Sequence, residues 1–286
     1  MIINPNVITT PAFSHNHTMI FKSSRVFALV TFAALILIPS LIVVLGSFKT
    51  DAEVYNKPLS LPENWNFDNY RRLLSDSDLD VSFRNSIFVT FASVLLTLIF
   101  ASLASFAIAR MITVSGKVLA TLFAFGLAIP AQINLVPIYY IFRDLGLTNS
   151  FFGLILINVT TTLPISIFIL TAFFREISRD MYEASEVDGA SPFRIYRSIA
   201  LPLSRPAMGA TAIFLFVINW NDLLWPLLLI QESEKKTLPL AMLAYRGEYF
   251  VSFSMLFTAV MVASLPMVIM YLMMQRSFIA GLTAGA

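Results

Sequence analysis

Six long apolar segments constrain the fold of this chain more than any other feature. An α-helix rises about 1.5 Å per residue, so about 20 apolar residues cross the roughly 30 Å hydrocarbon core of a bilayer. Five of the segments contain no Asp, Glu, Lys or Arg, and the other contains a single acid, Asp222. The sequence therefore predicts an all-α bundle of six transmembrane helices over Val26–Phe48, Ile87–Ala109, Val118–Phe142, Phe151–Phe174, Met208–Ile230 and Val251–Met274.

Composition supports a multi-pass membrane protein. Hydrophobic residues make up 57% of the 286 residues and charged residues 13%, about half the charged fraction of a soluble domain. The net charge of +2 is too small to favour a nucleic-acid partner, and the absence of cysteine excludes disulfides and thiol chemistry. His15 and His17 are the only histidines. Two ligands do not complete a tetrahedral site, so no metal site is expected.

Loop charges give a weak indication of topology. Six spans place both termini on one side, where the loops hold ten Lys and Arg against nine on the other side. Among the short loops, Arg110 and Lys117 share one side and Arg143 stands alone on the other, which favours cytoplasmic termini. The chain then divides into a cytosolic tail (1–25) and a transmembrane domain (26–286) that includes a cytosolic loop (175–207) and a C-terminal tail (275–286).

The charged stretch between the fourth and fifth apolar segments predicts two short helices with a bend between them. Asp180 is expected to be an N-cap, since Glu183 follows it by three residues, and a helix is expected over 181–187. Gly189 has no Cβ and can adopt a positive φ, which allows a sharp turn. The first short helix is therefore expected to end at this glycine.

A second short helix is expected directly after the bend. Ser191 before Pro192 is typical of an N-cap followed by a proline in the first turn, and Leu201-Pro202 is expected to end the helix. One face of this helix would carry Phe193, Tyr196 and Ala200. The local pattern leaves open an amphipathic helix that lies on the lipid surface.

The same residues resemble a family motif. Glu183-Ala184-Ser185, Asp188-Gly189-Ala190 and Ile199-Ala200-Leu201-Pro202 resemble the "EAA" loop of permease subunits in ABC importers, with Ser185 in place of the usual second alanine. The resemblance implies a coupling helix that docks into a cleft of a cytosolic ATPase and transmits its closure. The residues that it implies in this coupling are Glu183, Ala184, Asp188, Gly189, Phe193, Leu201 and Pro202.

The resemblance extends over nearly the whole chain, to the carbohydrate, or maltose-type, branch. "SFKTDAEVY", "LGLTNS", "WNDLLWPLLL" and the ending "QRSFIAGLTAGA" are similar to that branch. The resemblance implies a sugar importer of a bacterial or archaeal plasma membrane, with cytoplasmic termini and alternating access. The implied partners are a second homologous permease subunit, a dimer of ATPase subunits, an extracytoplasmic solute-binding protein and a sugar.

The resemblance also implies roles for two further segments, and it implies that the chain has no cofactor of its own. ATP and magnesium would bind the partner ATPase. The C-terminal tail would insert along the ATPase dimer interface, and the outer loop over 231–250 would reach the solute-binding protein. The solute class stays open to a polyol or a glycerol phosphodiester.

Polar residues inside the apolar segments have two interpretations. Asp222 is the only acid there, and intramembrane acids are candidates for functional sites. Amides, carboxylates and aromatic faces would suit sugar recognition, yet the same residue types form hydrogen bonds between helices in a bilayer. The residues that could line a translocation pathway are Gln132, Asn134, Asn158, Asn219, Trp220 and Asp222.

An enzyme or a channel finds little support in the sequence. There is no Gly-x-x-x-x-Gly-Lys-Ser/Thr loop, no His-Glu-x-x-His and no Gly-x-Ser-x-Gly. An intramembrane hydrolase would need a second polar partner for Asp222 at bilayer depth, and a channel would need pore loops or charged rings. The chain is therefore expected not to hydrolyse ATP itself.

Overall fold

The computed structural model describes residues 15–75, 77–111, 113–245 and 252–284, and every regular element in these ranges is a helix. The predicted all-α class is therefore confirmed. Four helices contain a stretch long and apolar enough to cross a membrane, and two bent helix pairs raise the possible number of spans to six. The four are α1 (His15–Gly46), α4 (Ser77–Arg110), α7 (Phe151–Glu176) and α14 (Phe253–Ala284).

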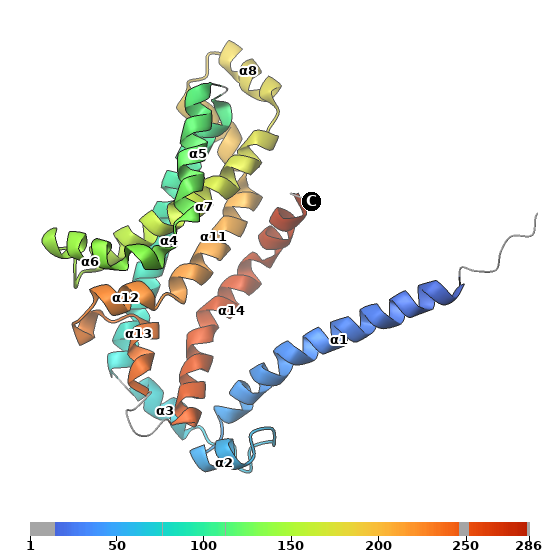
Figure 1. Ribbon diagram of the computed structural model, residues 1–286, viewed down its shortest axis with the longest axis vertical. Helices are drawn as coiled ribbons and strands as arrows, with labels where there is room; N and C mark the ends of the chain where they lie inside the picture. Colours follow the sequence, from blue (N-terminus) through green and yellow to red (C-terminus); the bar gives the residue numbers. More distant parts are fainter. Residues whose placement is uncertain (1–14, 76, 112, 246–251, 285–286) are drawn as a thin grey trace, which may run out of the picture.

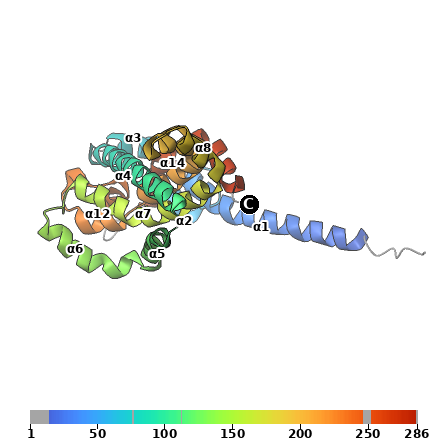
Figure 2. The same ribbon diagram turned by 90° about the horizontal axis from the view of Figure 1, so that it is seen from above.

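The third predicted span, Val118–Phe142, is broken in the structure, so its prediction as one helix is wrong. The segment forms α5 (Val114–Ala128), a 3-10 turn η1 (Ala131–Asn134) and α6 (Leu135–Asp144), and the two long parts meet at 80°. Pro130 has no backbone N–H and disfavours the helical region for the residue before it. Figures 1 and 2 show α6 running across the direction of α5.

The fifth predicted span, Met208–Ile230, is also not one helix. Here α11 (Arg205–Trp220) ends, and α12 (Leu224–Leu229) begins after three intervening residues. In the break, the Asp222 carboxylate accepts hydrogen bonds from the backbone N–H groups of Leu224 at 3.1 Å and Trp225 at 3.4 Å. These bonds stabilise the start of α12 and the break before it.

The first helix stands apart from the rest of the chain. α1 begins at His15, earlier than the predicted start at Val26, so the described part of the predicted tail is helical. Its apolar window over Arg25–Gly46 is not buried, and Figures 1 and 2 show α1 projecting from the other helices. Such a surface requires lipid or another protein to cover it. Residues 1–14 lie outside the described ranges.

α4 and α7 form the centre of the bundle through small polar residues. Thr97 and Ser105 on α4 are fully buried. The hydroxyls of Thr97 and Thr162 lie 3.2 Å apart, and the Ser105 hydroxyl donates to the Ile167 carbonyl at 3.1 Å. Small side chains let helix backbones approach closely, and their hydroxyls form hydrogen bonds across the interface.

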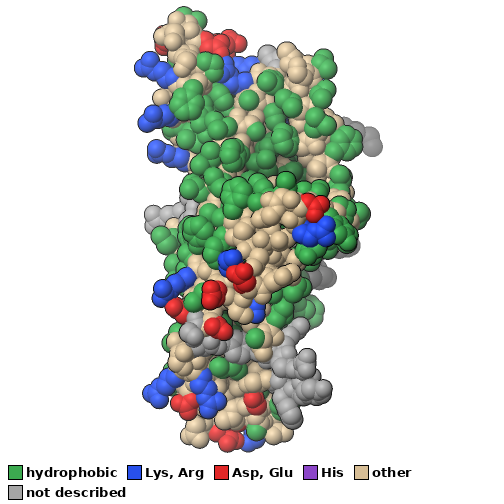
Figure 3. Space-filling view, turned by 90° about the vertical axis from the view of Figure 1, so that its left-hand side faces the viewer, with side chains coloured by type: hydrophobic (Ala, Val, Ile, Leu, Met, Phe, Trp, Pro, Cys, Tyr) green, Lys and Arg blue, Asp and Glu red, His purple; other side chains and the backbone are tan. Residues whose placement is uncertain are grey.

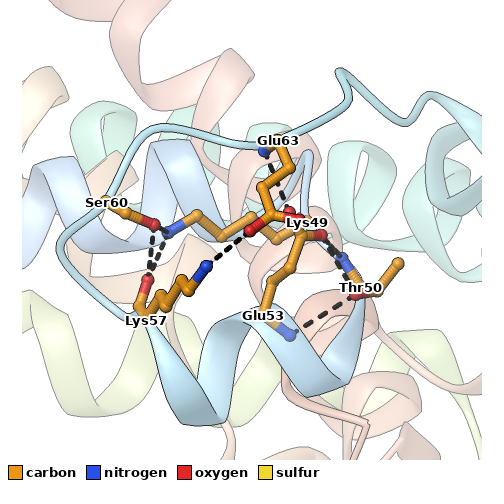
Figure 4. Close-up of polar contacts among 6 residues, drawn as sticks. All are labelled: Lys49, Thr50, Glu53, Lys57, Ser60 and Glu63. Carbon is orange, nitrogen blue, oxygen red and sulfur yellow. Dashed lines mark hydrogen bonds and ion pairs between the residues drawn. The ribbon is translucent and has the colours of Figure 1, made fainter.

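A buried lysine organises the loop after α1 (Figure 4). The side chain of Lys49 is fully buried, and its ammonium donates to the Lys57 carbonyl at 2.7 Å. Thr50 and Glu53 form a capping box at the start of α2 (Asp51–Asn56). The backbone N–H of Thr50 is one of the donors that lower the pKa of the Glu53 carboxyl. The sequence alone gave no indication of a buried cation in this loop.

Short helices and the last turns of α14 complete the chain. At the end opposite α8 lie α3 (Asp68–Ser75), η3 (Ser233–Lys235), α13 (Leu238–Met242) and η4 (Leu243–Tyr245). The backbone of the predicted C-terminal tail continues as helix to Ala284, and residues 285–286 lie outside the described ranges. Its insertion at an ATPase interface stays a prediction, and so does the role of the loop over 231–250, of which 246–250 are not described.

Candidate functional site

The site begins at α8 (Arg179–Val187), which starts two residues before the predicted helix. Ser178 is the N-cap, and its hydroxyl accepts from the backbone N–H of Asp180 at 3.2 Å. The prediction of Asp180 as N-cap is therefore wrong. Asp180 lies in the first turn instead, where a carboxylate interacts favourably with the helix dipole.

The bend after α8 has the geometry that the sequence predicts. Gly189 has a φ of +78°, in the left-handed region. Its backbone N–H donates to the Glu186 carbonyl at 3.0 Å, and the N–H of Ala190 donates to the Ser185 carbonyl at 3.0 Å. This pair of bonds is a Schellman motif, in which glycine is the favoured residue at the left-handed position.

The second short helix is longer than predicted. Ser191 is its N-cap, as expected, with its hydroxyl accepting from Arg194 N–H at 3.4 Å. The helix passes through α9 (Pro192–Ile195), a π-helical turn η2 (Tyr196–Ala200) and α10 (Leu201–Leu203). The predicted end at Leu201-Pro202 is wrong.

The π-helical turn explains how the chain accommodates Pro202. Proline has no N–H to donate to the carbonyl one turn earlier. The N–H of Leu201 donates to the Tyr196 carbonyl, five residues back, so the chain widens by one residue before the proline and the helix continues.

Both short helices are attached to the bundle through Phe106 of α4. The Phe106 ring lies 5.4 Å from the Tyr196 ring and 6.0 Å from the rings of Tyr182 and Phe174, measured between centroids. The Tyr196 hydroxyl lies 2.7 Å from the Ser102 hydroxyl. Edge-on and tilted aromatic contacts of this kind favour one relative orientation of the elements that they join.

Arg110 forms a second attachment between α4 and α8. Its guanidinium pairs with Glu186, 76 residues later in the sequence, and lies over the rings of Phe106 at 5.3 Å and Tyr182 at 5.4 Å. Burial raises the pKa of the Tyr182 hydroxyl, and the positive charge of Arg110 partly offsets this. Sequence analysis did not identify this ion pair. The spacing of Phe106 and Arg110 places both on one face of α4, but nothing in the sequence identifies Glu186 as a partner.

The predicted coupling residues lie mainly on the exposed side of this assembly. Glu183, Ala184 and Asp188 are exposed, and the Phe193 side chain is 64% exposed. The Phe193 ring lies 6.1 Å from the Tyr196 ring, its neighbour on the predicted face, but Phe193 is at the exposed edge of that face whereas Tyr196 is buried. Leu201 and Pro202 are half-buried. In the described part of the chain, Glu183 has no ion-pair partner, so an exposed acid and an exposed aromatic ring remain available at this end of the molecule.

The candidate pathway residues lie in three separate places, and no hydrogen bond between the described residues joins these places. Gln132 and Asn134 belong to η1 at the break between α5 and α6. Asn158 of α7 is buried, and its amide lies 3.5 Å from the Ser93 hydroxyl of α4. The third group, Asn219, Trp220 and Asp222, lies around the end of α11.

The residues at the end of α11 combine packing with unsatisfied polar atoms. The Trp220 ring is buried, stacks on Phe216 with a 10° interplanar angle and donates its indole N–H to the Ala263 carbonyl at 3.0 Å. The Asn219 amide nitrogen and one Asp222 carboxylate oxygen are buried without a hydrogen-bond partner among the described residues. Trp220 therefore joins α11 to α14, whereas Asn219 and Asp222 each keep a polar atom that the described residues do not satisfy. No group of three metal-ligating side chains occurs in the described ranges.

Comparison with known proteins identifies clear relatives. Residues 101–279 match the family described as "Binding-protein-dependent transport system inner membrane component". The chain is 33% identical to the diacetylchitobiose uptake system permease protein NgcG of Streptomyces coelicolor, over 92% of this chain and 90% of that protein. It is also 33% identical to the trehalose/maltose permease protein MalG of Thermococcus litoralis, over 89% and 92% of the two chains.

A solved structure agrees with these matches. The chain superposes on a chain of a bacterial ABC transporter involved in import of the acidic polysaccharide alginate with a TM-score of 0.81 and 25% identity. The superposition covers 94% of this chain and all of the other. The similarity therefore includes the helices outside the matched family region.

Proposed function

Because the chain belongs to the family of binding-protein-dependent transport system inner membrane components, we propose that it forms one half of the translocation pathway of an ABC sugar importer. It is a multi-pass permease subunit and not an enzyme. The proposal of a sugar as solute is supported by its relatives, which are named for diacetylchitobiose and for trehalose and maltose. ATP hydrolysis belongs to a pair of partner ATPase subunits, and a second permease subunit completes the pathway.

The main structural support for this proposal is the attachment of α8 and α9 to α4. The exposed residues of the two short helices form the docking surface for the ATPase, and the Phe106 cluster links that surface to the transmembrane helices. Closure of the ATPase dimer on ATP would therefore move α8 and α4 together. Such a movement changes access to the pathway only if the ATPase binds the two states with different affinity.

The orientation follows from the same docking. The end that carries α8 faces the cytosol together with both termini, and the end that carries α2, α3 and α13 faces the solute-binding protein.

Transport is tested with the chain, its partner permease, ATPase and binding protein reconstituted in proteoliposomes. ATP-dependent uptake of an oligosaccharide bound by the binding protein is the expected result. Uptake of a polyol or glycerol phosphodiester in its place would contradict the proposed solute.

Glu183→Lys is expected to weaken capture of the ATPase by about fivefold at low salt, because an exposed charge pair of up to about 1 kcal/mol is lost and replaced by repulsion. Co-purification of the ATPase at two salt concentrations measures this. Glu234→Lys is the matched control, since it reverses an exposed acid outside the docking surface. Equal ATPase recovery for both variants and the parent protein would contradict a docking role for Glu183.

Asn149 is expected to determine the position of the outer loop toward the binding protein. Its φ is +54°, and its side-chain oxygen accepts from the backbone N–H groups of Gln231 at 3.2 Å and Glu232 at 3.1 Å. Asn149→Ala removes both bonds, each worth about 1 kcal/mol, and adds strain of about 1–2 kcal/mol. We expect binding-protein stimulation of the ATPase to fall.

The matched control for this loop is Asn149→Asp. Aspartate keeps an acceptor oxygen and also tolerates the left-handed region. It should retain most of the stimulation that Asn149→Ala loses. Full stimulation in Asn149→Ala would show that the position of residues 231–232 does not matter to the binding protein.

A further inference from the structure

A groove between α5 and α7 leads to a basic cleft at the α8 end of the molecule. The groove has a volume of about 340 Å³ and is lined largely by apolar and small side chains, among them Ala124, Phe168 and Ala172. The cleft has a volume of about 660 Å³ and includes Lys117 and Arg179. Arg175, in the last turn of α7, lines both cavities, so the two lie next to each other.

The charges of the cleft favour an anion. Its walls carry four cations, Arg110, Lys117, Arg175 and Arg179, and two acids, Glu183 and Glu186. Arg110 pairs with Glu186. In the ranges that the structure describes, the other three cations have no ion-pair partner, and Glu183 is the one acid that opposes them. The cleft therefore holds unneutralised positive charge next to an apolar groove.

Two buried hydroxyls in these walls lack partners. Thr171 lines the groove and is 8% exposed, and Tyr182 lines the cleft and is 7% exposed. Neither hydroxyl oxygen has a hydrogen-bond partner among the described residues. A buried hydroxyl without a partner is unfavourable, so a ligand atom that came within reach of either hydroxyl could satisfy it. Thr171 lies beside the apolar groove, where the ester oxygens of an amphiphile would be found.

We propose that this combined cavity binds one anionic glycerophospholipid, with its phosphate among Lys117, Arg175 and Arg179 and an acyl chain between α5 and α7. A free phosphate would use only the basic cleft, whereas an acyl chain needs the groove. The site lies at the end of a membrane-spanning helix, which is the level of lipid headgroups, and basic pockets between such helices favour anionic lipids. Figure 3 shows the face that carries α5, with charged side chains at its upper end and a band of hydrophobic side chains below them.

The bound lipid would join the membrane-spanning helices to the coupling assembly. Lys117 belongs to α5 and Arg175 to α7, whereas Arg179 and Tyr182 belong to α8. A phosphate between these elements would reduce the movement of α8 relative to α5 and α7. The lipid would therefore act as a structural ligand that holds the coupling helix in place.

The test measures lipid binding to the assembled, detergent-purified permease–ATPase complex. Native mass spectrometry with dioleoyl-phosphatidylglycerol gives the affinity, with dioleoyl-phosphatidylcholine as the neutral comparison. The double variant Lys117→Ala/Arg175→Ala should lower phosphatidylglycerol affinity at least about tenfold, since each cation near a lipid surface contributes about 1 kcal/mol. Ala124→Trp, which fills the groove and keeps every cation, should lower it by a similar factor.

Controls separate the lipid from other occupants. Arg71→Ala/Arg72→Ala removes two exposed cations of α3, outside both the cleft and the ATPase docking surface, and it should leave the affinity unchanged. An equal loss in that control would show a general charge effect and overturn the site. Displacement by millimolar inorganic phosphate, together with normal binding in Ala124→Trp, would assign the cleft to a free anion. Crosslinking of residue 124 to the partner permease would assign the groove to a protein contact.

Discussion

Gly189→Val is expected to abolish most ATP-driven uptake while the protein still inserts into the membrane. The backbone of Gly189 has a φ of +78°, which costs an ordinary L-residue about 1–2 kcal/mol and a β-branched residue more. An added Cβ would meet no atom within 4 Å, so the effect comes from backbone strain and not from a clash. A cost of this size lowers the population of the native bend by about tenfold or more. Uptake and ATPase activity in proteoliposomes measure the loss.

Two further variants test whether the loss of uptake is specific to the bend at Gly189 or follows from strain at any left-handed glycine. Gly189→Asn should retain most uptake, because asparagine tolerates the left-handed region. Gly146 has a φ of +66° with open space around it, at a turn remote from α8, so Gly146→Val adds comparable strain elsewhere. If Gly146→Val and Gly189→Val lose uptake equally, the effect is not specific to coupling. Normal uptake in Gly189→Val would contradict the prediction outright.

Ile195→Ala and Phe193→Ala should affect the second short helix by different mechanisms. Ile195 is fully buried in the cluster around Phe106, and removal of a buried Ile side chain to alanine costs about 2–5 kcal/mol. Phe193 is 64% exposed, so its truncation should change stability by less than about 0.5 kcal/mol. We expect Ile195→Ala to loosen α8 and α9 from α4, and Phe193→Ala to remove an aromatic contact to the ATPase.

Two measurements distinguish these effects. Thermal unfolding of the permease without its ATPase should shift for Ile195→Ala and not for Phe193→Ala. Co-purification of the ATPase should fall for both variants, since one displaces the docking surface and the other changes it directly. Normal ATPase recovery with Phe193→Ala would show that the exposed ring is not part of the interface.

The coupling segment shows how far local sequence patterns reach. The N-cap, the first turn and the bend were predictable because each depends on the backbone preference of a single residue. These residues are Ser191, Pro192 and Gly189. The π-helical turn before Pro202 was not predictable, because a proline at this position can either end the helix or follow a widened turn that lets the helix continue. Packing of Tyr196 and Ala200 against α4 selects the second outcome.

The broken spans show the corresponding limit of hydropathy. Both halves of Val118–Phe142 are apolar, so an average over the window does not detect the 80° bend at Pro130. Prolines inside α1, α7 and α14 leave those helices continuous, so proline alone does not predict a break. Neighbouring helices decide which of these prolines interrupt the chain.

By itself the sequence determined the features that depend on a few neighbouring residues: the apolar segments, the caps around the bend and the left-handed glycine. Hydrophobicity, a missing N–H and a missing Cβ act within about one helical turn, so they can be recognised without a partner. Tertiary structure alone decided that Arg110 meets Glu186 and that Lys49 is buried on backbone carbonyls. These contacts depend on the packing of distant helices and on how a loop closes on itself, because a buried charge is stable only where the fold supplies its partners.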